Sequence, residues 1–93
     1  MKLGKGSLYR MGGFHMANIG FPLPLATQGH RYTVVSVRGL DERRRFLANL
    51  GFVEGADVSV VSGMGGNYII DIKGTRIALN QALASRVMVG DVV

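Results

Sequence analysis

The sequence predicts a mainly β domain, a small and partly open barrel of about five short strands with one inserted α-helix and one short helical turn. Three observations lead to this prediction. The chain has 93 residues, which is enough for one domain and too few for a second core. Short runs rich in valine and isoleucine alternate with turns that contain many of the 14 glycines. One stretch, Leu40–Gly55, has the spacing and end signals of an amphipathic helix.

The N-terminal segment, residues 1–20, has scattered glycines and apolar residues but no sustained period, which predicts a flexible extension. We therefore place the folded domain at residues 21–93. Its first part, Phe21–Leu25, is expected to be extended because a residue before proline is pushed out of the helical region. We expect Leu25 to be the first core residue and Ala26–Gly29 to form a turn.

The helix prediction rests on the periodicity after Asp41, a residue that can lie at or next to the N-cap and accept hydrogen bonds from free amides there. Three apolar residues follow on one face, which we expect to be buried: Phe46, Leu47 and Leu50. The most charged feature of the chain lies mostly on the opposite face: Arg43, Arg44 and Arg45.

The helix is predicted to end at Gly51, which supplies the left-handed residue of a Schellman motif. In that motif the next residue, Phe52, contacts the residue three positions inside the helix end, which is Leu47. Val53–Gly55 then forms a tight turn into the next strand. This stretch is where the predicted helix joins the predicted barrel.

The expected strands are Arg31–Arg38, Asp57–Ser62, Tyr68–Ile72, Thr75–Leu79 and Arg86–Val89. Alternation places six of their residues inward: Val58, Val60, Ile77, Leu79, Val87 and Val89. Gly63–Asn67 is predicted to be a flexible loop, whereas Lys73-Gly74 fits a two-residue hairpin turn. Asn80 is expected to cap a single helical turn, Gln81–Ala84.

No catalytic residues, metal ligands or cofactor site can be assigned from the sequence. The chain has no cysteine, which excludes disulfides and thiolate chemistry and fits a reducing compartment. Its two histidines, His15 and His30, have no evident catalytic partner, and the carboxylates are few and scattered. The glycine-rich run Gly63–Gly66 lacks the Lys-Ser/Thr pair of a phosphate-binding loop. We therefore expect no enzyme activity and, at most, weak binding of Fe(II) or Zn(II).

The formal net charge of +5 suits an acidic protein surface, a membrane headgroup layer or nucleic acid. The arginine run at 43–45 is either a solvated helix face or a docking patch for an acidic partner. Nucleic-acid binding is the least favoured alternative, because no stacking aromatics and no second basic stripe accompany the run. No signal peptide is visible, and no apolar run approaches the roughly 20 residues needed to span a bilayer.

Leu47–Gly55 followed by Val58-Ser59-Val60 resembles the L-x-x-L-G-F-x-x-G-x-x-V-x-V signature of the FeoA family. The later run Gly74–Leu79, with the alanines and valines after it, resembles that family's second segment, and Leu25–Gly29 its opening turn. The residues that we assign to the structural motif are Leu47, Leu50, Gly51, Phe52, Gly55, Gly74, Ile77 and Leu79. The chain departs from the pattern at Glu54, where the family often has proline, and residues 1–20 have no counterpart.

The resemblance implies an SH3-like barrel and a small cytoplasmic accessory protein of bacterial ferrous iron uptake. Such proteins are thought to act on FeoB, a membrane transporter with a cytoplasmic GTP-binding domain. The expected partner is therefore a FeoB-type transporter, with Arg43, Arg44 and Arg45 as the binding residues and self-association as a further option. The alternative is a free-standing barrel like the C-terminal domain of iron-dependent repressors, acting in metal-dependent regulation.

Overall fold

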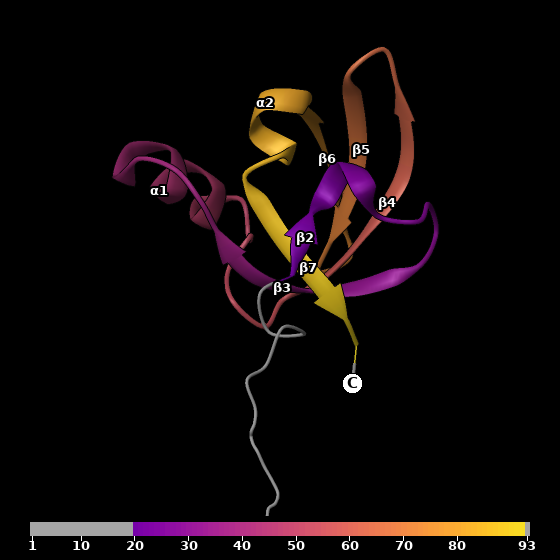
Figure 1. The fold of residues 1–93 in the computed structure, drawn as a ribbon, viewed down its shortest axis with the longest axis horizontal. Helices are drawn as coiled ribbons and strands as arrows, with labels where there is room; N and C mark the ends of the chain where they lie inside the picture. Colours follow the sequence, from indigo (N-terminus) through magenta and orange to yellow (C-terminus); the bar gives the residue numbers. More distant parts are fainter. Residues whose placement is uncertain (1–19, 93) are drawn as a thin grey trace, which may run out of the picture.

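The computed structural model describes residues 20–92, which form a single curved antiparallel sheet with two α-helices and one short 3-10 helix (Figure 1). The strand order is β2-β7-β3-β4-β5-β6, so β2 and β6 are the two edges and the sheet does not close. The predicted fold class is confirmed. The predicted extension, residues 1–20, lies outside the described residues except for Gly20. No helix of the described part has the length and apolar character required to cross a membrane.

The strands are β2 (Phe21–Pro22), β3 (Arg31–Val37), β4 (Asp57–Met64), β5 (Asn67–Ile72), β6 (Thr75–Asn80) and β7 (Val87–Asp91). The helices are the 3-10 helix η2 (Leu23–Leu25), α1 (Asp41–Asn49) and α2 (Gln81–Ala84). Strand β7, the last strand described, lies between β2 and β3 and is therefore an interior strand of the sheet. Helix α2 follows the edge strand β6 and contacts β5, β6 and η2, whereas η2 follows the other edge strand, β2.

The segment Phe21–Leu25, at the start of the folded domain, differs from the prediction. Phe21 and Pro22 are extended and pair with β7, but Leu23–Leu25 turns into a 3-10 helix closed by the Ala26 amide bonding to the Leu23 carbonyl at 2.9 Å. Leu23 is fully buried, whereas Leu25 is 73% exposed, so the expected core role of Leu25 is wrong. The fixed φ of proline suits a 3-10 turn as well as an extended chain. Burial of the Leu23 side chain selects the turn.

The core is built from alternate residues of the strands together with one residue of each helix (Leu23, Leu47 and Ala84) and the segment that follows α1. Its largest fully buried side chains are Phe52, Leu23, Leu47, Ile70, Ile72, Val34, Val58, Val87 and Val89. Five of the predicted inward residues are buried: Val58, Val60, Leu79, Val87 and Val89. The sixth, Ile77, is partly buried and packs against the same core. The period-2 pattern of the strands therefore predicted their inner faces correctly.

Two hairpins connect β4, β5 and β6. The flexible loop predicted at Gly63–Asn67 is wrong, because β4 continues through Met64 and only Gly65 and Gly66 form the turn. Both turn glycines have positive φ, as a tight two-residue hairpin requires. Gly63 lies within β4 opposite Tyr68, and a β-carbon there would meet the tyrosine ring at 2.8 Å. The glycine is therefore a packing requirement of the strand.

The second hairpin confirms the prediction made for Lys73-Gly74. Both residues have positive φ, and the flanking pair is Ile72 opposite Thr75. The side chain of Asn80 then accepts a hydrogen bond from the Leu83 amide at 2.9 Å, which confirms the predicted cap of α2. These local signals account for the chain path from β5 to α2.

Candidate functional site

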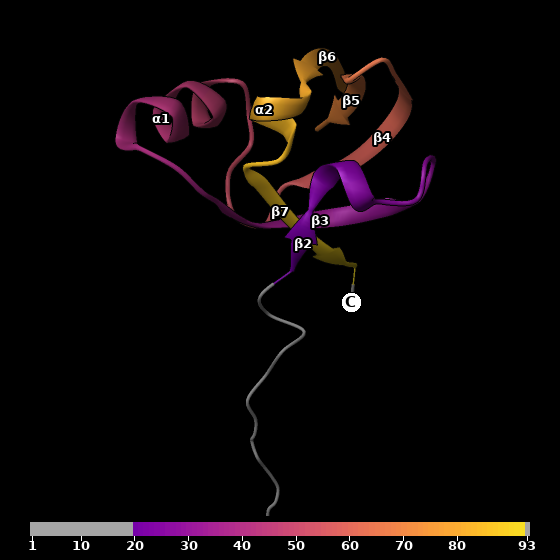
Figure 2. The same ribbon diagram turned by 45° about the horizontal axis from the view of Figure 1, so that its top comes forward.

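Helix α1 stands apart from the sheet in both views of the molecule (Figures 1 and 2). Only one of its nine residues, Leu47, is buried, and Leu50 just beyond its end packs against the core from a partly buried position. Phe46 is 50% exposed, so its predicted burial is wrong. The reason is geometric, because consecutive helix residues point about 100° apart, so the core that buries Leu47 does not cover Phe46. Most of α1 is therefore free surface.

The start of α1 also differs in detail from the prediction. Leu40 is the N-cap residue and supplies no side-chain hydrogen bond to the helix. Asp41 lies next to it, as expected, but its carboxylate pairs with Arg44 one turn later and not with free amides. A residue inside the first turn cannot reach the amides as an N-cap side chain does. The carboxylate still lies at the positive end of the helix dipole.

The end of α1 forms the predicted Schellman motif. The Phe52 amide bonds to the Leu47 carbonyl and the Gly51 amide to the Ala48 carbonyl, both at 3.0 Å. Gly51 has a φ of 110°, and Phe52 is 1% exposed. A turn through Gly55 follows, in which the Gly55 amide bonds to the Val34 carbonyl of β3 at 2.8 Å. The helix end is therefore held rigidly although the helix itself is mostly exposed.

The three predicted partner-binding residues, Arg43, Arg44 and Arg45, are all exposed on α1. Arg44 is paired with Asp41, whereas Arg43 and Arg45 form no salt bridge with any residue of the described part of the chain. Arg44 and Arg45 also line an open groove between α1 and the turn that follows it. The apolar residues of that groove are Val37, Ala48, Phe52 and Val53, and its acidic residues are Asp41 and Glu54.

The residues assigned to the structural motif lie in the core, against it, or in turns. Leu47 and Phe52 belong to the core, and Leu50 packs against it. Gly55 and Gly74 each have positive φ in a turn. Ile77 and Leu79 face the core from β6. The motif thus marks how the helix end and the last hairpin join the barrel, and it contains none of the exposed residues of α1.

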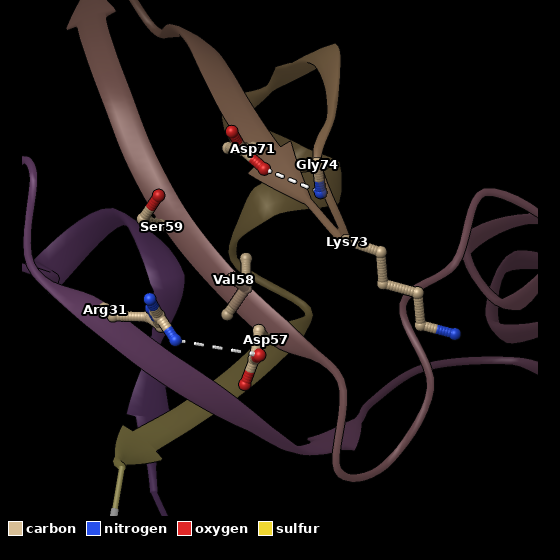
Figure 3. A pocket seen from close by; sticks show the side chains of 7 residues that line it. All are labelled: Arg31, Asp57, Val58, Ser59, Asp71, Lys73 and Gly74. Carbon is tan, nitrogen blue, oxygen red and sulfur yellow. Dashed lines mark hydrogen bonds and ion pairs between the residues drawn. The ribbon is translucent and has the colours of Figure 1, made fainter.

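A second hollow lies on the outer side of β3, β4 and β5 (Figure 3). Arg31 approaches Asp57 there, with 3.9 Å between Nη1 and Oδ2. Asp71 accepts a hydrogen bond from the Gly74 amide at 3.0 Å, which stabilises the hairpin turn. The ammonium group of Lys73 points away from these groups (Figure 3). Arg31 and the two carboxylates therefore remain around the hollow, and each carboxylate already has a partner in the chain.

The described residues offer no evident metal site. No group of three or more histidine, aspartate or glutamate side chains able to hold a metal occurs among residues 20–92. His30 lies 3.3 Å from Asp91, measured from Nε2 to Oδ1, and its ring centroid lies 4.7 Å from that of Tyr32. These contacts connect the start of β3 to the end of β7. His15 lies outside the described residues.

Comparison with known proteins gives the family. The model of the FeoA domain matches residues 21–90, which is most of the chain. The chain belongs to the FeoA family. This membership confirms the resemblance found in the sequence, and the match runs from the start of β2 to the last residue but one of β7. No curated protein sequence matches the chain.

Two solved structures are similar in sequence as well as in fold. An iron uptake regulatory protein (FeoA) is 33% identical, with a TM-score of 0.69 over 74% of this chain and 93% of the other. The FeoA of Stenotrophomonas maltophilia, solved with zinc, is 32% identical, with a TM-score of 0.68 over 75% of this chain and 89% of that protein. It is described as an SH3 domain protein and as a candidate bacterial ferrous iron transport activating factor.

One further likeness is to a different class of protein. The structure of the manganese-activated repressor ScaR with bound zinc is 19% identical, with a TM-score of 0.67. The match covers 77% of this chain and 37% of ScaR. At this identity the comparison shows a shared fold alone.

Proposed function

We propose that this chain is a non-enzymatic accessory protein of ferrous iron uptake that binds the cytoplasmic GTP-binding domain of a FeoB-type transporter. Membership of the FeoA family and the description of the Stenotrophomonas maltophilia relative support a role in iron transport. The observation that carries the docking site is helix α1, which stands apart from the sheet with all three arginines exposed. The proposed place of action is the cytoplasm, at the inner face of the membrane.

The three arginines can raise both the rate of encounter and the affinity of such docking. Exposed charges speed the encounter with a surface of opposite charge more than they add affinity. Each exposed pair is worth roughly 0–1 kcal/mol, so a single substitution should have a small effect and three together a measurable one. Arg43 and Arg45 lose no internal salt bridge on binding, because they have none in the described structure.

The test replaces Arg43, Arg44 and Arg45 together by glutamate. We expect the variant to melt like the wild type, because all three side chains are exposed. We expect it to lose binding to the cytoplasmic domain of the transporter and to fail to restore ferrous iron uptake in cells that lack the native protein. Binding of the wild type should weaken as salt rises, since exposed charges are screened within about 10 Å at 0.1 M salt.

A matched pair of double variants controls for net charge. Arg43→Glu/Arg45→Glu changes α1, and Arg31→Glu/Arg76→Glu makes the same charge change on β3 and β6, also at exposed residues. Only the α1 pair should impair binding. Equal losses from the two pairs would show a net-charge effect, and full uptake by the triple variant would show that the arginines are merely solvated.

The alternative is a free-standing barrel that acts in metal-dependent regulation, like the domain of iron-dependent repressors. The likeness to ScaR favours this alternative only through the fold. Affinity capture with the GTP-binding domain of the transporter distinguishes the two. Retention of this chain supports the accessory role, and failure of retention at low salt favours the regulatory one.

A further inference from the structure

The barrel covers only part of the side of α1 that carries the apolar residues. At 3.6 residues per turn, Arg43, Phe46, Leu47 and Leu50 fall within about a third of the helix circumference, and Leu40 precedes Arg43 by three residues. The core covers Leu47, which is fully buried. It leaves Leu40, just before the helix, 75% exposed, and Phe46, about 100° around the helix from Leu47, 50% exposed.

Two other exposed apolar residues, Leu25 and Met64, do not share this setting. Leu25 lies in η2 and Met64 lies at the end of β4, and they are 73% and 86% exposed. Single exposed apolar side chains of this kind are ordinary on protein surfaces. Leu40 and Phe46, in contrast, flank the unpaired Arg43 on the same helix. Phenylalanine and arginine are both enriched in protein interfaces relative to the rest of the surface.

A further arginine lies at the start of this helix. The side chain of Arg86 packs against Gly39, so closely that any β-carbon there would clash with its guanidinium group. Its Nε atom is buried without a hydrogen-bond partner, and no carboxylate of the described residues pairs with it. Arg86 thus adds positive charge next to Leu40, which Arg43 extends along the helix. An acidic partner would be complementary to this charge.

We propose that Leu40, Arg43 and Phe46, here named the α1 contact surface, bind a protein surface that has an apolar pocket bordered by carboxylates. The inference rests on the proposed function and adds the chemistry of the partner. Phe46 and Leu40 enter the pocket, while Arg43 and Arg86 face its acidic border. Carboxylates that surround an apolar contact become more effective partners for arginine as water leaves the interface.

A membrane surface fits these residues less well. Helix α1 carries Asp41 and Glu42 besides its three arginines, so its net positive charge is small. Helices that lie in a membrane interface have a continuous apolar face opposite a basic one. Here the most apolar part of the helix, around Leu47, is already covered by the barrel. Two exposed apolar side chains remain, which is enough to fill a pocket and too few for such a face.

The experiment compares four variants of the full chain, titrated calorimetrically with the purified cytoplasmic domain of the FeoB-type transporter. Phe46→Ala and Leu40→Ala change the α1 contact surface, and Leu25→Ala and Met64→Ala are controls at exposed apolar residues elsewhere, with Leu25 matching Leu40 in exposure. We expect Phe46→Ala to weaken binding about tenfold or more and Leu40→Ala severalfold, with both controls within about twofold of wild type. Thermal melts of all four should resemble that of the wild type.

Different outcomes separate this inference from the proposed function. If the wild type binds the domain and Phe46→Ala and Leu40→Ala bind equally well, the α1 contact surface is wrong while the accessory role stands. If the wild type does not bind at all, the proposed function fails and this inference fails with it. Vesicles of phosphatidylglycerol and phosphatidylcholine provide the second arm. Retention on these vesicles that depends on Phe46, with domain binding unaffected by its loss, would overturn the inference in favour of a membrane site.

Discussion

Helix α1 and strand β7 are opposite extremes of packing in this small protein. Four of the five residues of β7 are buried, because the strand lies between β2 and β3 and contributes to the core. Only one of the nine residues of α1 is buried. A strand in the middle of a curved sheet has no surface to spare, whereas a helix attached by its last turn presents most of its side chains to a partner. The difference separates the part that holds the fold from the part available for binding.

The largest expected effect is at Leu47, and its neighbour Phe46 is the control. Leu47→Ala should destabilise the protein by about 2–5 kcal/mol, because it leaves a cavity where the helix joins the core. Phe46→Ala should change stability by less than about 0.5 kcal/mol, because the side chain lies outside the core. Urea melts of both variants measure this. Similar losses at the two residues would mean that α1 packs along its whole length, which would remove the contrast with β7.

A smaller effect is expected at the end of the helix. Gly51→Ala should cost about 1 kcal/mol, because a β-carbon is disfavoured at the φ of 110° found there. The added carbon would meet Ile72 at 3.4 Å, an ordinary contact, so the cost is mainly one of backbone conformation. Gly51→Val should cost more, and Gly51→Asn less, since asparagine tolerates this region better. Melts in which all three variants equal the wild type would show that the helix end tolerates another geometry.

The smallest effect is expected at the start of the helix, and its sign is opposite. Leu40 provides no capping side chain, whereas Asn80 caps α2. Leu40→Asn should therefore stabilise the protein by roughly 0.5–1 kcal/mol. The same variant should bind the transporter domain more weakly, because it removes an exposed apolar side chain of the α1 contact surface. A melting curve and a titration of one sample check both statements. A variant that gains stability and keeps full affinity would show that Leu40 has no role in docking.

The exposed residues of α1 were only partly accessible to sequence reasoning. The arginine run was visible as the most charged feature, and its exposure follows from its charge. The role proposed for Leu40 and Phe46 was not visible, because an apolar residue on an amphipathic helix is normally a core residue. Arg86 lies far from α1 in the sequence and meets Gly39 only through the pairing of β7 with β3. No pattern of neighbouring residues in the sequence could have shown that Arg86 lies at the start of α1.

The sequence by itself determined the features that depend on a few neighbouring residues. Gly51 ends α1, Lys73 and Gly74 make a tight hairpin, and Asn80 caps α2, because each is decided by backbone conformation or by a hydrogen bond within one turn. The alternation of the strands likewise determined their inner faces. Only the tertiary structure decided which of two neighbouring apolar residues is buried in the core. Leu23 is buried and Leu25 is exposed, and Leu47 is buried while Phe46 is half exposed. Burial depends on what lies opposite a side chain, and those opposing residues come from distant parts of the chain.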